Sequence, residues 1–341
     1  MNPDVVLPLL SSLLSFIFFV LLVDQWRVRR RSFQAAWALG MLWYAISAGT
    51  EFLGAAGGWS EGLYRAWYLF GAVFVAAWLG MGTALLLART RYGYMLAALL
   101  LGGGLASFAG RTKYADAAEA GTVILAIAAI LAVVVVILTF RERHVWAHAV
   151  AAVLVAGSIA AAVVVLTAPL PAPGYVLNAQ GVPIGELFPG SVRVLSPVFN
   201  IAGGLTLTFG AVFSAYVFMP KRRVINYDLE REQGWLRVAF NVLLGIVAIP
   251  VNFLASIPSA VRAYRSGTLN SRVPATLLLA VGGVVPSITS SLNRFGVTSA
   301  FFLGELLGVV FLFLGFLASI EVFREFRVPF TNKVLRARRA E

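Results

Sequence analysis

One glutamate stands inside an otherwise apolar stretch of the sequence. Glu305 occurs in FFLGELLGVVF, between Gly304 and Gly308. An ionisable side chain at membrane depth is costly and commonly marks a ligand site or a proton path, although it can also form a structural ion pair near the interface. Arg294 is a basic partner close by in sequence. We therefore consider Glu305 the strongest candidate for a ligand-binding or proton-carrying residue.

A second glutamate lies in a region rich in aromatic residues. Glu51 closes one apolar stretch in AGTEFLG, and Arg65 opens the next in GLYRAWYLF. The short connection predicts that these two pair, chiefly as a structural ion pair. Three aromatic residues lie deeper in the same hairpin and either line a pocket or pack as core: Trp43, Tyr44 and Trp78. Four others suit the aromatic belt of a membrane interface: Trp59, Tyr64, Trp67 and Tyr68.

Other catalytic patterns are weak in this sequence. His144 and His148 share a helix face at a spacing of four, but the H-E-x-x-H pattern of zinc proteases does not occur. There is no cysteine, no P-loop, and no Ser–His pair or paired carboxylates at a short spacing. We expect neither a metal nor a cofactor, and the sequence favours a protein that is not an enzyme.

The elements that must position these residues are membrane helices. The chain of 341 residues is 60% hydrophobic and 12% charged, whereas soluble chains are about 45–50% apolar and about 25% charged. The apolar residues fall into blocks long enough to cross a bilayer. These blocks span residues 5–23, 33–54, 66–88, 94–110, 120–140, 146–167, 194–218, 238–258, 274–292 and 298–323. The pattern predicts an all-α, polytopic integral membrane helical bundle.

The basic residues predict its orientation. Short cytoplasmic loops carry an excess of Lys and Arg, and the first block ends in DQWRVRRR. If this cluster is cytoplasmic, the N-terminus lies outside, and the loops of the first seven blocks hold thirteen basic residues inside against four outside. The net charge of +12 is then explained by anionic lipid headgroups beside these loops, not by nucleic acid. We expect a multi-pass protein of the cell membrane.

The eighth block, 238–258, is the predicted exception. If it does not cross, all 27 basic residues divide into twenty-two inside and five outside, and the C-terminus is cytoplasmic. Pro250 and Pro258 favour a break, and a stripe of small and polar residues that includes Asn252 follows one side. The alternative is an ordinary crossing helix. We predict about nine crossings: seven, then a re-entrant or interfacial segment, then two.

This topology divides the sequence into four parts. They are a seven-helix membrane bundle (1–220), a basic cytoplasmic linker (221–237), a C-terminal membrane region (238–323) and a basic cytoplasmic tail (324–341). FGAVFVA at 70–76 matches FGAVFSA at 209–215, which suggests either a repeat or chance in a restricted alphabet. Gly and Ser seams in blocks seven and ten suit close helix packing, homo-oligomers or a membrane partner.

Three functions are compatible with this pattern. The first is a transporter or permease for a small ligand, supported by Glu305, by Pro286 interrupting the ninth block and by the eighth segment. The second is a seven-helix sensing or scaffold protein that docks a partner through its C-terminal region. The third and least supported is an intramembrane enzyme acting on a lipid. Asn252 joins the glutamates, Arg65 and the three deeper aromatic residues as a candidate ligand-binding residue.

Overall fold

Helices make up most of the described chain. The computed structural model describes residues 2–228, 234–294, 299–319, 325–331 and 334–337. The principal helices are α1 (Pro3–Arg29), α2 (Ser32–Gly57), α3 (Glu61–Trp67), α4 (Ala76–Leu86), α5 (Gly93–Ala109), α6 (Ala118–Phe140), α7 (Trp146–Thr167), α8 (Gly190–Arg193), α9 (Leu195–Phe218), α10 (Trp235–Arg265), α11 (Arg272–Arg294) and α12 (Ser299–Ala318). The π-helix η1 (Tyr68–Val75) joins α3 to α4, and the short 3₁₀ helices are η2 (Gly110–Thr112), η3 (Ala115–Ala117) and η4 (Gly185–Leu187). Two short antiparallel strands, β1 (Glu325–Arg327) and β2 (Val334–Ala337), follow α12.

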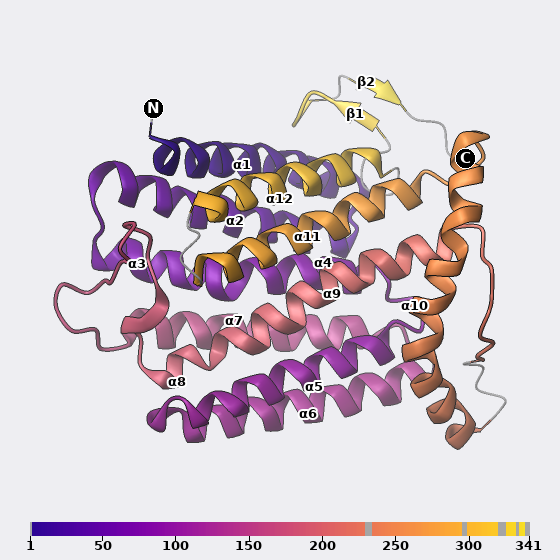
Figure 1. Cartoon of the computed structure of the whole chain (residues 1–341), viewed down its shortest axis with the longest axis horizontal. Helices are drawn as coiled ribbons and strands as arrows, with labels where there is room; N and C mark the ends of the chain where they lie inside the picture. The colour runs from indigo at the N-terminus through magenta and orange to yellow at the C-terminus, as the bar shows by residue number, and fades with distance from the viewer. Residues whose placement is uncertain (1, 229–233, 295–298, 320–324, 332–333, 338–341) are drawn as a thin grey trace.

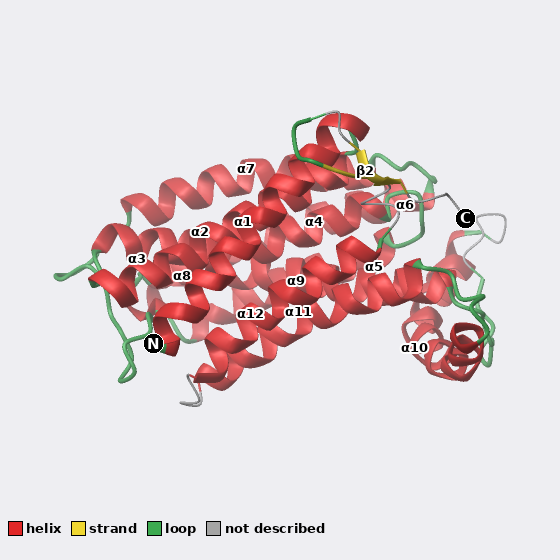
Figure 2. Ribbon diagram, turned by 90° about the horizontal axis from the view of Figure 1, so that it is seen from above, coloured by secondary structure: helices red, strands yellow, loops and turns green. Residues whose placement is uncertain are grey.

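The long helices other than α10 lie side by side along one axis (Figures 1 and 2). Within the described residues, eight helical spans are long and apolar enough to cross a bilayer by themselves. The two halves of α10 would make a ninth if they are taken together as one span. Helix α2 is less apolar, and it packs lengthwise between α1 and α4 inside the bundle. The prediction of a polytopic helical bundle with about nine crossings is confirmed. Which end faces the cytoplasm stays a prediction.

Helix α10 is the long helix that does not join this bundle. It lies across the ends of the others, nearly perpendicular to them, and is seen almost end-on in Figure 2. The predicted break is instead a bend of 49° between Gly245 and Val247. The bend falls four residues before Pro250, where a proline ring clashes with the helix backbone. The eighth block is therefore a bent helix that lies across one end of the bundle.

One hydrophobic core joins both ends of the sequence. It contains buried side chains from six helices: Phe18, Trp37, Leu79, Leu207, Leu279, Leu312 and Phe316. Trp37 packs edge-on against Phe316 at 4.5 Å between ring centroids. The C-terminal hairpin α11–α12 thus packs against α1 and α9 as part of the bundle. In contrast, α6 and α7 expose aliphatic side chains such as Ile130 and Ile159, at 66% and 62%, as expected of helices that face lipid.

Two glycines bring α4 and α9 unusually close. A Cβ atom on Gly80 would lie 2.3 Å from the backbone oxygen of Gly203. A Cβ atom on Gly203 would in turn lie 2.5 Å from the Cα of Ala77. Only residues without a side chain permit this approach, and such close packing gains dispersion contacts between membrane helices. The predicted seam of block seven is therefore used inside the bundle.

The two copies of the repeated heptapeptide have different conformations. Residues 70–75 of the first copy belong to the π-helix η1, whereas residues 209–215 lie in the regular helix α9. π-Helical bonding disturbs the regular pairing of backbone groups. Here the carbonyl of Ala72 accepts hydrogen bonds from Ser196 Oγ at 3.0 Å and Asn200 Nδ2 at 2.7 Å. The copies share residues without sharing a structural role.

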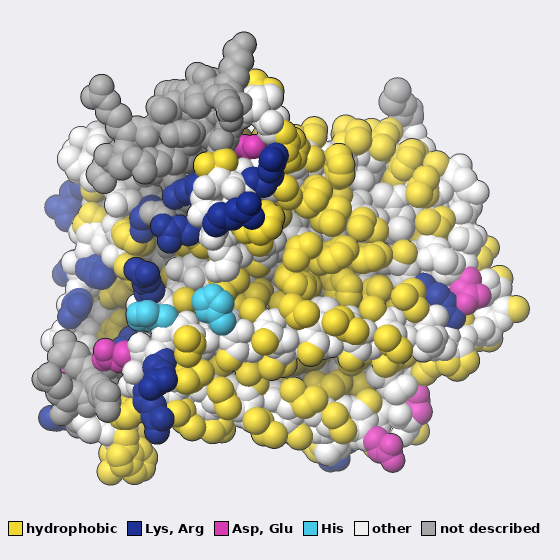
Figure 3. Space-filling model, turned by 180° about the vertical axis from the view of Figure 1, so that it is seen from behind, with side chains coloured by type: hydrophobic (Ala, Val, Ile, Leu, Met, Phe, Trp, Pro, Cys, Tyr) yellow, Lys and Arg dark blue, Asp and Glu magenta, His cyan; other side chains and the backbone are white. Residues whose placement is uncertain are grey.

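Basic side chains gather at one end of the bundle, visible at the left of Figure 3. We call this the basic end. The α1–α2, α4–α5 and α6–α7 turns and helix α10 all lie there (Figure 1). The C-terminal segment returns to it: the backbone N–H of Phe330 donates to Asp24 Oδ1 at 2.9 Å. Arg27 lies over the Phe330 ring, 5.1 Å from its centroid. The opposite end is called the far end.

Candidate functional site

Glu51 and Glu305 meet inside the bundle, although 254 positions separate them in the sequence. Glu51 comes from α2, where it is 1% exposed, and Glu305 comes from α12. Their carboxyl groups are close neighbours and interact electrostatically. Each residue lies six positions from the far end of its helix, or about 9 Å deep at the α-helical rise.

Two neighbouring carboxyl groups favour a proton between them. A carboxylate can only accept hydrogen bonds, so two carboxyl groups bond to each other only if one of them is protonated. Two adjacent negative charges would also repel strongly in a region of low dielectric constant. The geometry therefore suits a pair that shares one proton, or a pair that binds a cation in its place.

Two aromatic side chains hold the carboxyl pair. Trp67 Nε1 donates to Glu51 Oε1 at 2.9 Å. Tyr44 Oη donates to the backbone carbonyl of Glu305 at 3.0 Å, which ties α2 to α12 at this level. Tyr44 and Glu51 are seven residues apart on α2 and so lie on the same face of that helix. The positions of both glutamates are thus set by neighbours that carry no charge.

Unused hydrogen-bonding capacity remains at this site. The Oε2 atoms of Glu51 and Glu305 are both buried and have no hydrogen-bond partner among the described residues. Buried polar atoms are nearly always paired, and exceptions are frequent at functional sites. The two oxygen atoms are therefore available to a proton, a cation or a donor group on a ligand.

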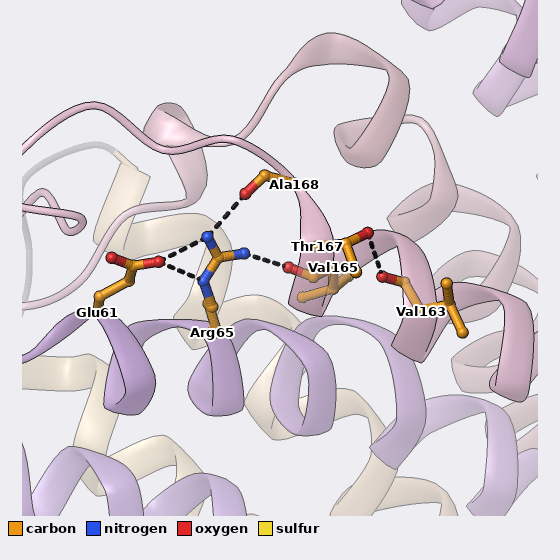
Figure 4. A network of polar contacts seen from close by, with 6 residues as sticks. All are labelled: Glu61, Arg65, Val163, Val165, Thr167 and Ala168. Carbon is orange, nitrogen blue, oxygen red and sulfur yellow. Dashed lines mark hydrogen bonds and ion pairs between the residues drawn. The ribbon is translucent and has the colours of Figure 1, made fainter.

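The predicted pairing of Glu51 with Arg65 is wrong. Arg65 instead forms an ion pair with Glu61, one helical turn earlier, at 2.6 Å (Figure 4). Its guanidinium also donates to the carbonyls of Val165 and Ala168 at 2.6 and 2.7 Å. Arg65 thus fastens α3 to the end of α7, because a guanidinium has enough donors to serve several acceptors at once. The side chain of Arg294, the partner considered for Glu305, lies outside the described residues.

The other two deep aromatic residues pack against neighbouring helices. Trp43 stacks on Phe70 of η1 at 5.1 Å between centroids, and its Nε1 is buried without a partner among the described residues. Trp78 Nε1 donates to Ser158 Oγ of α7 at 3.3 Å. Of the three aromatic residues predicted to line a pocket, only Tyr44 bonds directly to the backbone of the carboxyl pair.

Asn252 lies far from this site, on α10. Its Oδ1 accepts from the backbone N–H groups of Val224 and Ile225, and its Nδ2 donates to the carbonyl of Ile225. Ser256, one turn later, accepts from the N–H of Arg222. The polar stripe of the eighth block thus holds the preceding linker along α10. The carboxamide of Asn252 forms its hydrogen bonds within the protein.

The proline-rich loop between α7 and α8 covers the far end near the site. Phe188 stacks on Tyr64 of α3 at 5.2 Å between nearly parallel rings. Val182, at the tip of the loop, packs with Phe301 and Phe302, one turn before Glu305 on α12. The loop therefore packs against the helix that carries Glu305.

Several buried polar features are not evident from the sequence. Trp67 reads as an interfacial tryptophan, but it is a hydrogen-bond donor to Glu51. Ser11 and Ser15, at a spacing of four in the first apolar block, are fully buried and their hydroxyls lack partners among the described residues. That spacing within an apolar block is a usable signal. No comparable pattern marks the neighbouring carboxyls, because the two glutamates are 254 positions apart.

One argument for a discontinuous helix also fails. Pro286 lies inside α11, which runs unbroken from Arg272 to Arg294. A Cβ atom on Gly308 of α12 would lie 2.3 Å from the Pro286 ring. The proline is thus accommodated by a glycine on the neighbouring helix, and it forms a packing contact rather than an interruption.

Comparison of the chain with protein-family models, with curated proteins and with solved structures found no match in any of the three.

Proposed function

We propose that this protein is a transporter or permease for a small ligand in the cell membrane, and that Glu51 and Glu305 carry the proton or cation that drives it. The observation behind this proposal is the contact of two carboxyl groups inside a membrane bundle. Ionisable groups at this depth are expensive to maintain and mark ion or substrate paths. Apolar side chains would form a purely structural contact between α2 and α12 at a lower cost in free energy.

The chemistry of the pair suits coupling. When the shared proton leaves, two adjacent negative charges remain, and they favour entry of a cation or of a ligand that carries a positive group. When a proton returns, that cation is released. The proton and the cation or ligand thus exclude each other at this site. The loop that packs on Phe301 and Phe302 closes the far end over α12, and in this proposal it must move to admit the ligand.

The competing scaffold function has less support. It requires a C-terminal region that is available to a partner. However, α11 and α12 pack against α9, α1 and each other, and they share the central core. The small residues of α12 are used in this packing, since a Cβ atom on Gly315 would lie 2.8 Å from the Ala275 carbonyl oxygen of α11.

The first experiment measures protonation directly. Infrared difference spectra of the protein in lipid, recorded between acidic and alkaline pH, report the C=O stretch of protonated carboxyl groups. We expect a band that is lost in both Glu51→Gln and Glu305→Gln and retained in Glu119→Gln, because Glu119 is exposed at the far end. An identical band in all four proteins would refute a shared proton.

The second experiment tests transport. Proteoliposomes on a solid-supported membrane receive concentration jumps of sodium, potassium and a panel of organic amines, and charge movement is recorded as a transient current. We expect at least one cation to give a current in wild type and in Glu119→Gln that Glu305→Gln loses. If every responsive compound gives equal currents in Glu305→Gln and wild type, the pair does not carry the coupling ion.

A further inference from the structure

A pocket of about 190 Å³ lies at the basic end, remote from the carboxyl pair. Its walls come from the α4–α5 turn and from the end of α6 with the α6–α7 turn. Arg89 and Arg91 line it from the first turn, and Arg143 and His144 line it from the second. Basic side chains and histidines lie together on this part of the surface in Figure 3.

The pocket is positively charged. Glu142 is the only carboxylate among the residues that line it, and it is paired with Arg91 at 2.6 Å. Arg91 also donates to the carbonyl of Thr139 at 3.0 Å, which fixes its guanidinium against the end of α6. Arg89 and Arg143 add two further positive charges. Three guanidinium groups against one carboxylate leave a surplus that suits an anion.

The turn that forms one wall is held in an unusual conformation. Glu142 has a φ of 57°, in the left-handed region where glycine normally ends a helix. A residue with a side chain costs roughly 1–2 kcal/mol there. Its carboxylate bonds to Arg91 across the pocket, and the backbone N–H of Arg143 bonds to the carbonyl of Leu138. The side chain of Glu142 thus ties the two turns together.

A buried threonine and a buried tryptophan complete the walls of the pocket. Thr139 lines the pocket and is 2% exposed, and its Oγ1 packs against Gly93 of α5. The buried indole of Trp146 also lines the pocket. Guanidinium donors beside an aromatic wall are suited to an oxyanion.

We propose that this pocket binds a phosphate group. Phosphate presents several acceptor oxygens, and guanidinium groups bind it through two parallel hydrogen bonds. The pocket lies where four helices leave the apolar region, which is the depth of lipid headgroups. The phosphate therefore belongs either to an anionic lipid of that leaflet or to a small soluble phosphate compound. The site is independent of the carboxyl pair and of its proposed function.

The experiment measures binding to the purified full chain in detergent by two probes. One is inorganic phosphate, and the other is short-chain phosphatidic acid, each followed by thermal-shift titration. We expect Arg89→Gln combined with Arg143→Gln to weaken binding at least tenfold. Arg141→Gln is the matched control, because Arg141 is exposed in the same turn but does not line the pocket. Glu305→Gln should bind as wild type does, which separates this site from the carboxyl pair.

A second variant guards against misfolding. Arg89→Gln alone changes a side chain that is exposed and lines the pocket, so it should weaken binding without lowering the melting temperature. Binding of phosphatidic acid alone identifies a headgroup site, and binding of both probes identifies a site open to soluble phosphate; either result supports the proposal. Binding of neither probe, or equal losses in Arg141→Gln and in the double variant, overturns it.

Discussion

At the scale of single residues, the proposed chemistry depends on the proximity of Glu51 and Glu305. Neither residue has a basic partner among the contacts that hold the pair, which are a tryptophan donor, a tyrosine hydroxyl and the other carboxyl group. The proton that the pair requires therefore comes from the medium rather than from a neighbouring cation. This makes its state depend on pH.

A double-mutant cycle tests the pair as an energetic unit. Glu51→Gln and Glu305→Gln each replace a carboxyl by an amide that cannot ionise. As the pH rises, wild type loses the shared proton and is destabilised by repulsion, whereas the single variants keep one neutral partner. We expect a coupling energy of about 0.5–3 kcal/mol in thermal denaturation at alkaline pH, and a smaller one at acidic pH. Additive effects at every pH would mean that the carboxyls do not interact.

Substitution of Trp67 by Phe removes the donor to Glu51. A buried acceptor that loses its partner costs about 1–3 kcal/mol, so we expect a lower melting temperature. Trp78→Phe is the matched control, because the hydrogen bond of Trp78 to Ser158 is longer, at 3.3 Å against 2.9 Å, and involves no carboxyl group. Equal losses in the two variants would assign Trp67 a packing role only.

At the scale of elements, glycine contacts determine how the helices pack. Gly80→Ala would place a methyl group against the Gly203 carbonyl. We expect a loss of stability of roughly 1–3 kcal/mol from overpacking. In Gly102→Ala the new Cβ meets open space, and the higher helix propensity of alanine should leave stability unchanged or raise it by up to about 1 kcal/mol. A melting curve of Gly80→Ala that matches Gly102→Ala would contradict the close crossing.

Helix α10 presents an apolar face away from the protein. The exposed side chains recur at helical spacing: Leu236, Phe240, Leu243, Val247, Leu254 and Val261. Its opposite face holds Asn252 and Ser256 against the linker. A helix of this kind lies in the plane of the bilayer surface with its apolar face in the acyl boundary.

Because the chain has no cysteine, single cysteines report this placement cleanly. We expect a fluorophore on Leu243→Cys, in vesicles, to be quenched by nitroxide groups on lipid chains. The same fluorophore on Ser266→Cys, in the exposed turn after α10, should respond instead to aqueous iodide. Quenching of both positions by iodide alone would show that α10 does not enter the lipid.

At the scale of the whole molecule, nine crossings place the two ends of the bundle on opposite sides of the membrane. Gln180 is exposed in the far-end loop, and Ser266 is exposed at the basic end. We expect an impermeant thiol reagent to label Gln180→Cys on intact cells and to reach Ser266→Cys only after lysis. Labelling of Ser266→Cys alone would reverse the orientation, and labelling of both would contradict an odd number of crossings.

The sequence alone determined the architecture of this protein. Apolar blocks of membrane length and the distribution of 27 basic residues depend on the cost of burying charge and backbone in lipid. That cost acts on each segment separately, so the crossings and the exceptional eighth block follow without knowledge of any contact. Glu305 and Glu51 are candidates for the same reason, because a charged residue inside an apolar block can be recognised from the sequence without knowledge of the fold.

Only the tertiary structure decided which of these residues meet. Glu51 lies beside Glu305 and accepts a hydrogen bond from Trp67, while Arg65 pairs with Glu61. In the sequence, however, Arg65 is far closer to Glu51 than Glu305 is. Which face of α2 meets α12 depends on how the side chains of six helices fill one core. Packing of this kind depends on many distant segments at once. The spacing of residues within one segment therefore does not predict it.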